Sequence, residues 1–144
     1  MKRTGSKLIL LARVFWAVSF VLVWVTVLSC SQPMANLGEE FSLHIGDSIG
    51  ITGEDLQVKF VGVPEDSRCP KEVTCIWEGR VSCAVEITSH ESIYRIVLTQ
   101  PGLSEQPART SFEDYKIDLR VEPYPEAGKN ITDAEYLLFL KFSK

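Results

Sequence analysis

From residue 41 onward, apolar and polar residues alternate along most of the chain. The alternating stretches are residues 41–45, 56–60, 81–87, 94–98 and 115–121, and residues 136–142 are nearly all apolar. A period of two with many β-branched and aromatic residues is typical of half-buried β-strands. We therefore predict a strand at each alternating stretch, and a central strand with both faces covered at residues 136–142.

Turn-forming residues separate these stretches, most clearly at Gly46-Asp47, Gly53-Glu54, Ser89-His90-Glu91 and Pro101-Gly102. Such residues favour tight turns through positive φ, a fixed φ or side-chain hydrogen bonds to the backbone. The pattern predicts an all-β domain over residues 41–144, with about six to eight short strands in a single antiparallel β-sandwich or small barrel. The longest loop, where binding sites often lie, is expected at residues 100–114.

The beginning of the chain has a different character. Residues 14–28 carry no charge and are almost all apolar, and the basic residues Lys2, Arg3, Lys7 and Arg13 precede them. This arrangement is typical of an export signal, and it is shorter than the roughly 20 residues that a membrane-spanning helix needs. Because basic residues stay on the cytoplasmic side, the rest of the chain is predicted to lie outside the cytoplasm.

The apolar run ends in Val27-Leu28-Ser29-Cys30, which resembles the lipobox of bacterial lipoproteins, although Leu28 is bulkier than the usual occupant. The resemblance implies a signal peptide over residues 1–29, lipid on Cys30, and a protein anchored extracytoplasmically to the membrane of a bacterial cell envelope. The polar residues 30–40, with Pro and Gly, then form a tether. The alternative is a plain secretory signal or an uncleaved anchor, with Cys30 an ordinary thiol.

The charge balance restricts the class of partner. Removing residues 1–29 leaves 115 residues, enough for one ordinary domain, with 11 basic and 19 acidic residues. A net charge near −8 argues against nucleic acid as a partner, since nucleic-acid binding needs a basic surface. It also argues against adsorption of the domain itself to anionic lipid, so attachment to the membrane depends on the lipid at Cys30.

Three cysteines follow Cys30. Outside the cytoplasm thiols tend to be oxidised, so Cys69 and Cys75 are interpreted first as a disulfide, although three internal cysteines allow three single bridges. Trp77, two residues beyond Cys75, is expected on the same face and over the disulfide if the strand is regular, and Gly79 allows a sharp turn into the next strand. Cys83 alternates with apolar residues and is interpreted as a buried free thiol.

The segment around the first two of these cysteines has the pattern D-S-R-C-P-x2-V-x-C-x-W-x-G, over residues 66–79. This pattern resembles that of small secreted or lipid-anchored bacterial proteins of unknown function. An opening F-x-L-x-x-G segment at residues 41–46 and a P-x-P segment at residues 123–125 extend the resemblance over nearly the whole domain. The resemblance implies a compact β domain with one disulfide, and it implies no activity.

The favoured function is recognition by a non-catalytic binding or accessory domain, whose partner is an envelope protein or glycan. A disulfide holds a loop in one shape and lowers the ordering cost of binding, and Arg and Trp are frequent interface anchors. The candidate recognition residues are Asp66, Arg68, Lys71, Glu72, Trp77 and Glu78. The competing interpretation is that Asp66 and Arg68 pair with each other or with the backbone, and that Trp77 belongs to the core.

The alternative function is an envelope redox or metal-handling protein that uses Cys69, Cys75 and Cys83. The cysteine spacings do not match the tight ligand pairs of structural zinc sites, and oxidised cysteines are not available as thiolates, so no metal or other cofactor is predicted. His44 and His90 are expected at the surface. Nucleophilic catalysis needs a nucleophile, a base within hydrogen-bond reach and an orienting group, and the sequence gives no sign of this arrangement around either histidine. The chain is therefore not predicted to be an enzyme.

Overall fold

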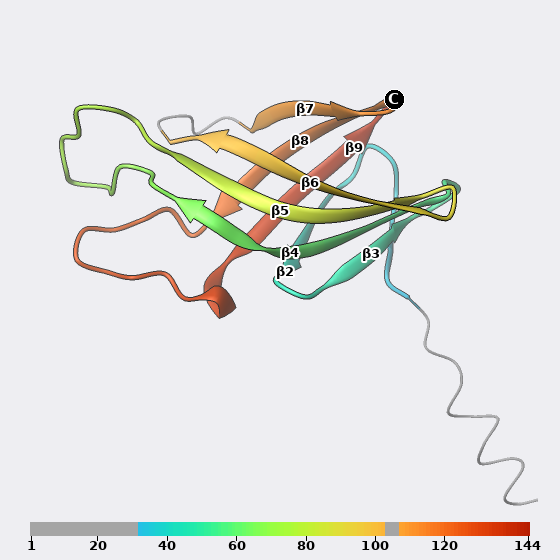
Figure 1. The fold of residues 1–144 in the computed structure, drawn as a ribbon, viewed down its shortest axis with the longest axis horizontal. Helices are drawn as coiled ribbons and strands as arrows, with labels where there is room; N and C mark the ends of the chain where they lie inside the picture. The colour runs from blue at the N-terminus through green and yellow to red at the C-terminus, as the bar shows by residue number, and fades with distance from the viewer. Residues whose placement is uncertain (1–31, 103–106) are drawn as a thin grey trace, which may run out of the picture. The chain divides into compact units, whose positions relative to one another are not determined.

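The computed structural model describes residues 32–102 and 107–144, and these residues form an all-β sandwich of two packed sheets (Figure 1). The predicted fold class is therefore confirmed, with a sandwich in place of the alternative barrel. The predicted signal peptide, residues 1–29, and the predicted lipidation site, Cys30, lie outside the described residues.

One sheet has five strands in the order β1-β3-β4-β5-β6. These strands span Met34–Ala35, Ser48–Ile51, Leu56–Asp66, Arg80–Ser89 and Ser92–Pro101, respectively. β1 runs parallel to β3, and the other neighbours in this sheet are antiparallel. Two register shifts interrupt β4 between Phe60 and Glu65, and irregularities of this kind bend a strand near its end.

The second sheet has four antiparallel strands in the order β2-β9-β8-β7. They span Glu40–His44, Leu137–Ser143, Tyr115–Glu122 and Ala108–Phe112, respectively. A short 3₁₀ turn, Asp133–Glu135, precedes β9. No helix within the described part of the chain is long and apolar enough to cross a membrane.

All six predicted strands are present, as β2, β4, β5, β6, β8 and β9. β7 lies inside residues 100–114, so the expectation of one long loop there is wrong. The reason is that β7 is an edge strand whose central residues, 109–111, are all polar and exposed, which removes the alternation by which a strand is recognised.

Part of the segment predicted as a tether, residues 30–40, packs onto the domain. Gly50 donates a backbone hydrogen bond to the carbonyl of Pro33 (3.0 Å), Thr52 donates one to that of Ala35 (2.8 Å), and Ala35 is buried. These contacts use mainly backbone groups, so the side chains of this segment give little indication of them.

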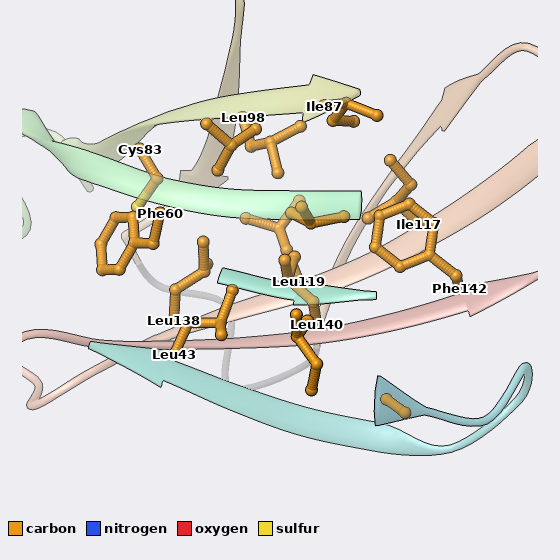
Figure 2. Close-up of a cluster of buried hydrophobic side chains, with 14 of the residues drawn as sticks. Leu43, Phe60, Cys83, Ile87, Leu98, Ile117, Leu119, Leu138, Leu140 and Phe142 are labelled. Carbon is orange, nitrogen blue, oxygen red and sulfur yellow. The ribbon is translucent and has the colours of Figure 1, made fainter. Parts of the chain in front are cut away.

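The inward faces of the two sheets meet in a single core (Figure 2). Its fully buried side chains include Val58, Phe60, Val81, Cys83, Val85 and Ile87 from one sheet, and Ile117, Leu119, Leu138, Leu140 and Phe142 from the other. Burying each large apolar side chain contributes roughly 1.5–3 kcal/mol, so the alternating residues supply most of the driving force for folding. β9 is central as predicted, but only its inward residues are fully buried; outward-facing Phe139 is half-buried, with the Arg120 guanidinium 4.1 Å from its ring centre.

Candidate functional site

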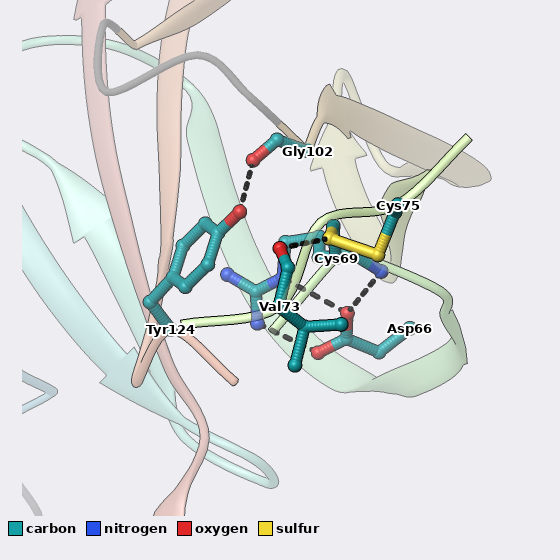
Figure 3. Close-up of a disulfide and its surroundings, with 7 residues drawn as sticks. Asp66, Cys69, Val73, Cys75, Gly102 and Tyr124 are labelled. Carbon is teal, nitrogen blue, oxygen red and sulfur yellow. Dashed lines mark hydrogen bonds and ion pairs between the residues drawn. A yellow bond between two sulfur atoms is a disulfide. The ribbon is translucent and has the colours of Figure 1, made fainter. Parts of the chain in front are cut away.

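The loop between β4 and β5, residues 67–79, contains most of the residues predicted for recognition. Cys69 and Cys75 form a disulfide within it, which confirms that prediction (Figure 3). Cys69 is buried and Cys75 is exposed, so the disulfide joins the base of the loop to its outer part. Cross-linking a loop this short removes conformational freedom from the unfolded chain and narrows the shapes of the folded loop.

Hydrogen bonds close the base of the loop. The backbone N–H of Ser67 donates to the carbonyl of Arg80 (2.8 Å), and that of Cys69 donates to the carbonyl of Glu78 (3.2 Å). Gly79 has φ +67°, and a Cβ at this position would lie 1.8 Å from the Ser67 carbonyl oxygen. Glycine is therefore required where the loop turns into β5, as the sequence predicted.

Asp66 and Arg68 form a buried ion pair beneath the loop. The Arg68 Nε and Nη2 atoms donate to the two carboxylate oxygens of Asp66, at 2.9 and 2.6 Å. The Arg68 side chain is 1% exposed and that of Asp66 is 9% exposed. Of the two interpretations drawn from the sequence, the structure shows pairing of these residues with each other, so neither is free to contact a partner.

The same guanidinium joins the two sheets. Arg68 Nη1 donates to the carbonyl of Val121 and Nη2 donates to that of Pro123, both at 2.9 Å, where the chain leaves β8. The hydroxyl of Tyr136 donates to Asp66 (3.1 Å). Burial and then the charge of Asp66 raise the pKa of Tyr136 to about 12, so this hydroxyl stays a neutral donor.

Tyr124 follows Pro123, whose carbonyl Arg68 binds, and forms one wall of a groove beside the loop. Its hydroxyl donates to the carbonyl of Gly102 (2.6 Å), and its ring centre lies 5.2 Å from the Arg68 guanidinium and 5.7 Å from Lys71 Nζ. The groove has a volume of about 650 Å³. It is lined by the disulfide loop (residues 69–73), by Gln100 near the end of β6 and Gly102 just after it, and by residues 120–122 and Tyr124 at the end of β8.

The outer part of the loop exposes three large apolar side chains, Val73, Ile76 and Trp77, which we call the apolar tip. Val73 is half-exposed, Ile76 is fully exposed and Trp77 is 78% exposed. The expectation that Trp77 covers the disulfide is wrong, and so is its alternative placement in the core. β5 begins only at Arg80, so the two-residue alternation from Cys75 to Trp77 does not apply.

The other predicted recognition residues lie around the tip and the groove. Lys71 and Glu72 line the groove. Glu72 also flanks the apolar tip in sequence, as does Glu78, and both glutamates are exposed. The sequence analysis missed Val73 and Ile76, which a search for apolar residues inside the polar disulfide loop would have found. It also missed Tyr124, which is 55 residues from Cys69 in sequence and has no local signal.

Cys83 is the one free cysteine among the described residues, and its side chain is fully buried in the core. Burial raises the pKa of its thiol to about 12. The two loop cysteines are joined to each other, so none of the three presents a thiolate at neutral pH in this structure.

The described ranges hold no candidate metal-binding cluster. Residues 32–102 and 107–144 contain no group of three or more His, Cys, Asp or Glu side chains placed to hold a metal ion. His44 and His90 are exposed, each near one aspartate at 3.6 Å, Asp47 and Asp55 respectively.

Comparison with known proteins adds no further assignment. No protein-family model matches the chain, and neither a curated protein nor a solved structure matches it significantly.

The buried ion pair predicts a large difference between two arginine substitutions. Arg68→Leu should lower the free energy of unfolding by about 3–5 kcal/mol, because it leaves the Asp66 carboxylate buried without its cation. Arg80→Leu is the matched control, since Arg80 pairs with Glu65 at the surface and such pairs contribute about 0–1 kcal/mol. Urea unfolding followed by circular dichroism measures both; equal effects would contradict the structural role of Arg68.

Cys83 should resist alkylation in the folded protein. With a pKa of about 12 and no exposed surface, only about 10⁻⁴ of the thiol is ionised at pH 8. We expect peptide mass mapping to find Cys83 unmodified by iodoacetamide in the native state, and modified after unfolding without reductant, while Cys69 and Cys75 react only after reduction. Rapid native labelling of Cys83 would instead favour the redox function.

Proposed function

We propose that this protein is a lipoprotein of a bacterial cell envelope, and that its β-sandwich is a non-catalytic recognition domain for an envelope protein or glycan. The contact surface in this proposal is the apolar tip, with Glu72 and Glu78 at its margin and the groove beside it. Asp66 and Arg68 support the loop from below and make no contact with the partner.

The observation that carries this proposal is the exposure of Ile76 and Trp77 on a loop braced by a disulfide. Exposing large apolar side chains to water is unfavourable, and clustered examples mark interaction sites. Trp is also among the residues that contribute most to binding when a partner excludes water from it. Because the disulfide and the Ser67 and Cys69 hydrogen bonds already restrain the loop, binding costs little further ordering.

The apolar tip lies far from the first described residues of the domain. The Gln57 side-chain amide, near the start of β4, donates to Gln32 at the beginning of the described domain (3.1 Å), whereas the disulfide loop follows Asp66 at the end of β4. Asp66 is nine residues after Gln57, which corresponds to about 30 Å along an extended strand. Gln32, the first described residue, therefore lies toward the end of β4 opposite the disulfide loop.

The anchor is tested by the intact mass of protein extracted from membranes. We expect a chain that begins at Cys30 and carries acyl groups, because each buried methylene of such a chain contributes roughly 0.8 kcal/mol to membrane attachment. A Cys30→Ser variant should lack the lipid and should keep residues 1–29. A wild-type chain that retains residues 1–29, or one that starts elsewhere without lipid, would contradict the lipoprotein assignment.

The recognition surface is tested by cross-linking on intact cells with a membrane-impermeant reagent. We expect defined envelope components to be enriched with the wild-type chain, and a loss of roughly tenfold or more in the Ile76→Ser and Trp77→Ala variants. Val61→Ser is the matched control, because Val61 is an exposed apolar residue on β4 outside the loop. Equal enrichment with all four proteins would exclude the tip as the contact surface.

A further inference from the structure

One edge of strand β6 has no strand partner in the described part of the chain. β6 is the last strand of the five-stranded sheet, and all ten of its residues pair with β5 without a register break. Among the residues that the structure describes, no strand pairs with its other side, and β7 of the second sheet approaches β6 through the ring contact between Phe112 and Tyr94. The backbone groups of β6 on that side have no strand partner among the described residues, which is the arrangement that a further strand can complete.

The turn between β5 and β6 identifies the groups that face this edge. His90 and Glu91, the two turn residues, both have positive φ, 48° and 62°, as a type I′ turn requires. In a two-residue hairpin the flanking residues, Ser89 and Ser92, are a hydrogen-bonded pair, and bonded and non-bonded pairs then alternate. The residues whose N–H and C=O groups point to the free edge are consequently Ile93, Arg95, Val97 and Thr99.

This edge lacks the features that usually prevent strands from pairing. Ile93 is 66% exposed and Val97 is 62% exposed. Arg95 is the only charged residue of β6, and Glu86 on β5 pairs with it at 2.8 Å. β6 has no bulge, and its only proline is its last residue. It is also long, with ten residues, whereas the edge strands β1, β2 and β7 have two, five and five residues, respectively. Short length, charges, bulges and internal prolines are the common protections of an edge strand.

We propose that β6 pairs antiparallel with β6 of a second copy of this chain, about a two-fold axis at Val97. The five-stranded sheets of the two copies then form one continuous sheet. In this register Val97 faces its own counterpart, Arg95 faces Thr99 of the second copy, and Ile93 faces Pro101 of the second copy. A two-fold interface uses the same residues twice, so the strand must complement itself.

Charge separation selects this register over its neighbours. With the axis at Val97, the two Arg95 residues are four strand positions apart, about 14 Å, which exceeds the Debye length of about 8 Å at physiological salt. Moving the axis to Ile96 reduces that separation to about 7 Å, and moving it to Arg95 places the two guanidinium groups directly opposite, about 5 Å apart. The Val97 register also puts an apolar pair at the centre of the interface.

The partner is a second copy because β6 meets the requirement of self-complementarity without another chain. Its outward face is apolar at the proposed centre, its one charged residue, Arg95, lies 2.8 Å from Glu86 of the same sheet, and in the proposed register Thr99 of the second copy places a hydroxyl opposite Arg95. Val97 also pairs with Ala84 on β5, so the apolar centre continues onto the outer face of the sheet.

The test is the protein mass of the full-length chain in detergent, from light scattering after size-exclusion chromatography. We expect a dimer for the wild type, and a dissociation constant that is roughly tenfold higher or more for Val97→Lys, since lysine on an edge opposes pairing. Val61→Lys is the matched control, because Val61 is exposed on β4 and not on the edge. Trp77→Ala should leave the dimer unchanged, which separates this proposal from the recognition function of the tip.

A second readout does not require the dimer to be weakened. The Val97→Cys variant should be joined to its counterpart by a short bismaleimide, whereas the Val61→Cys variant, with its thiol two strands further from the axis, should not. A wild-type chain that has the mass of a single copy at about 100 μM, where even a weak interface associates, would overturn the proposal. A dimer that Val97→Lys leaves intact would also overturn it, and so would cross-linking of the Val61→Cys variant without cross-linking of the Val97→Cys variant.

Discussion

The ion pair between Arg68 and Asp66 is the interaction on which the functional end of this domain depends. The guanidinium is almost completely buried, and it bonds to a carboxylate on its own side of the sandwich and to two carbonyls where the chain leaves β8. A buried charge is tolerated only when its hydrogen-bonding groups are satisfied and an opposite charge is close. The chain must therefore bring the end of β4 and the exit of β8 together before Arg68 can be buried.

Several features depend on this contact between the end of β4 and the exit of β8. Cys69 is the next residue after Arg68, so the disulfide starts from a fixed position. Tyr124 follows Pro123, whose carbonyl Arg68 binds, and the tyrosine ring and hydroxyl then form a wall of the groove. The loop can expose apolar side chains to water without collapsing onto the domain, because its two ends are held by hydrogen bonds and its middle by a covalent bond.

The two proposed interfaces lie on different parts of the sandwich and depend on different physics. The apolar tip offers side chains on an irregular loop, where a partner gains by excluding water from them. The β6 edge offers a regular row of backbone donors and acceptors, for which another strand is the natural complement. The tip lies in the loop after β4, whereas the edge runs along β6. The residues of the tip therefore take no part in the strand pairing of the proposed dimer.

The amino-acid sequence by itself determined the strands with an apolar and a polar face, the disulfide segment and the burial of Cys83, because alternation and residue type are local properties. Only the tertiary structure decided the order of the strands, the polar edge strand β7 and the partners of Arg68. Val121 is 53 residues from Arg68 in sequence, and a contact over that distance leaves no local pattern. The exposure of Trp77 was also a tertiary outcome, since alternation predicts a side chain's direction only where the backbone is a regular strand.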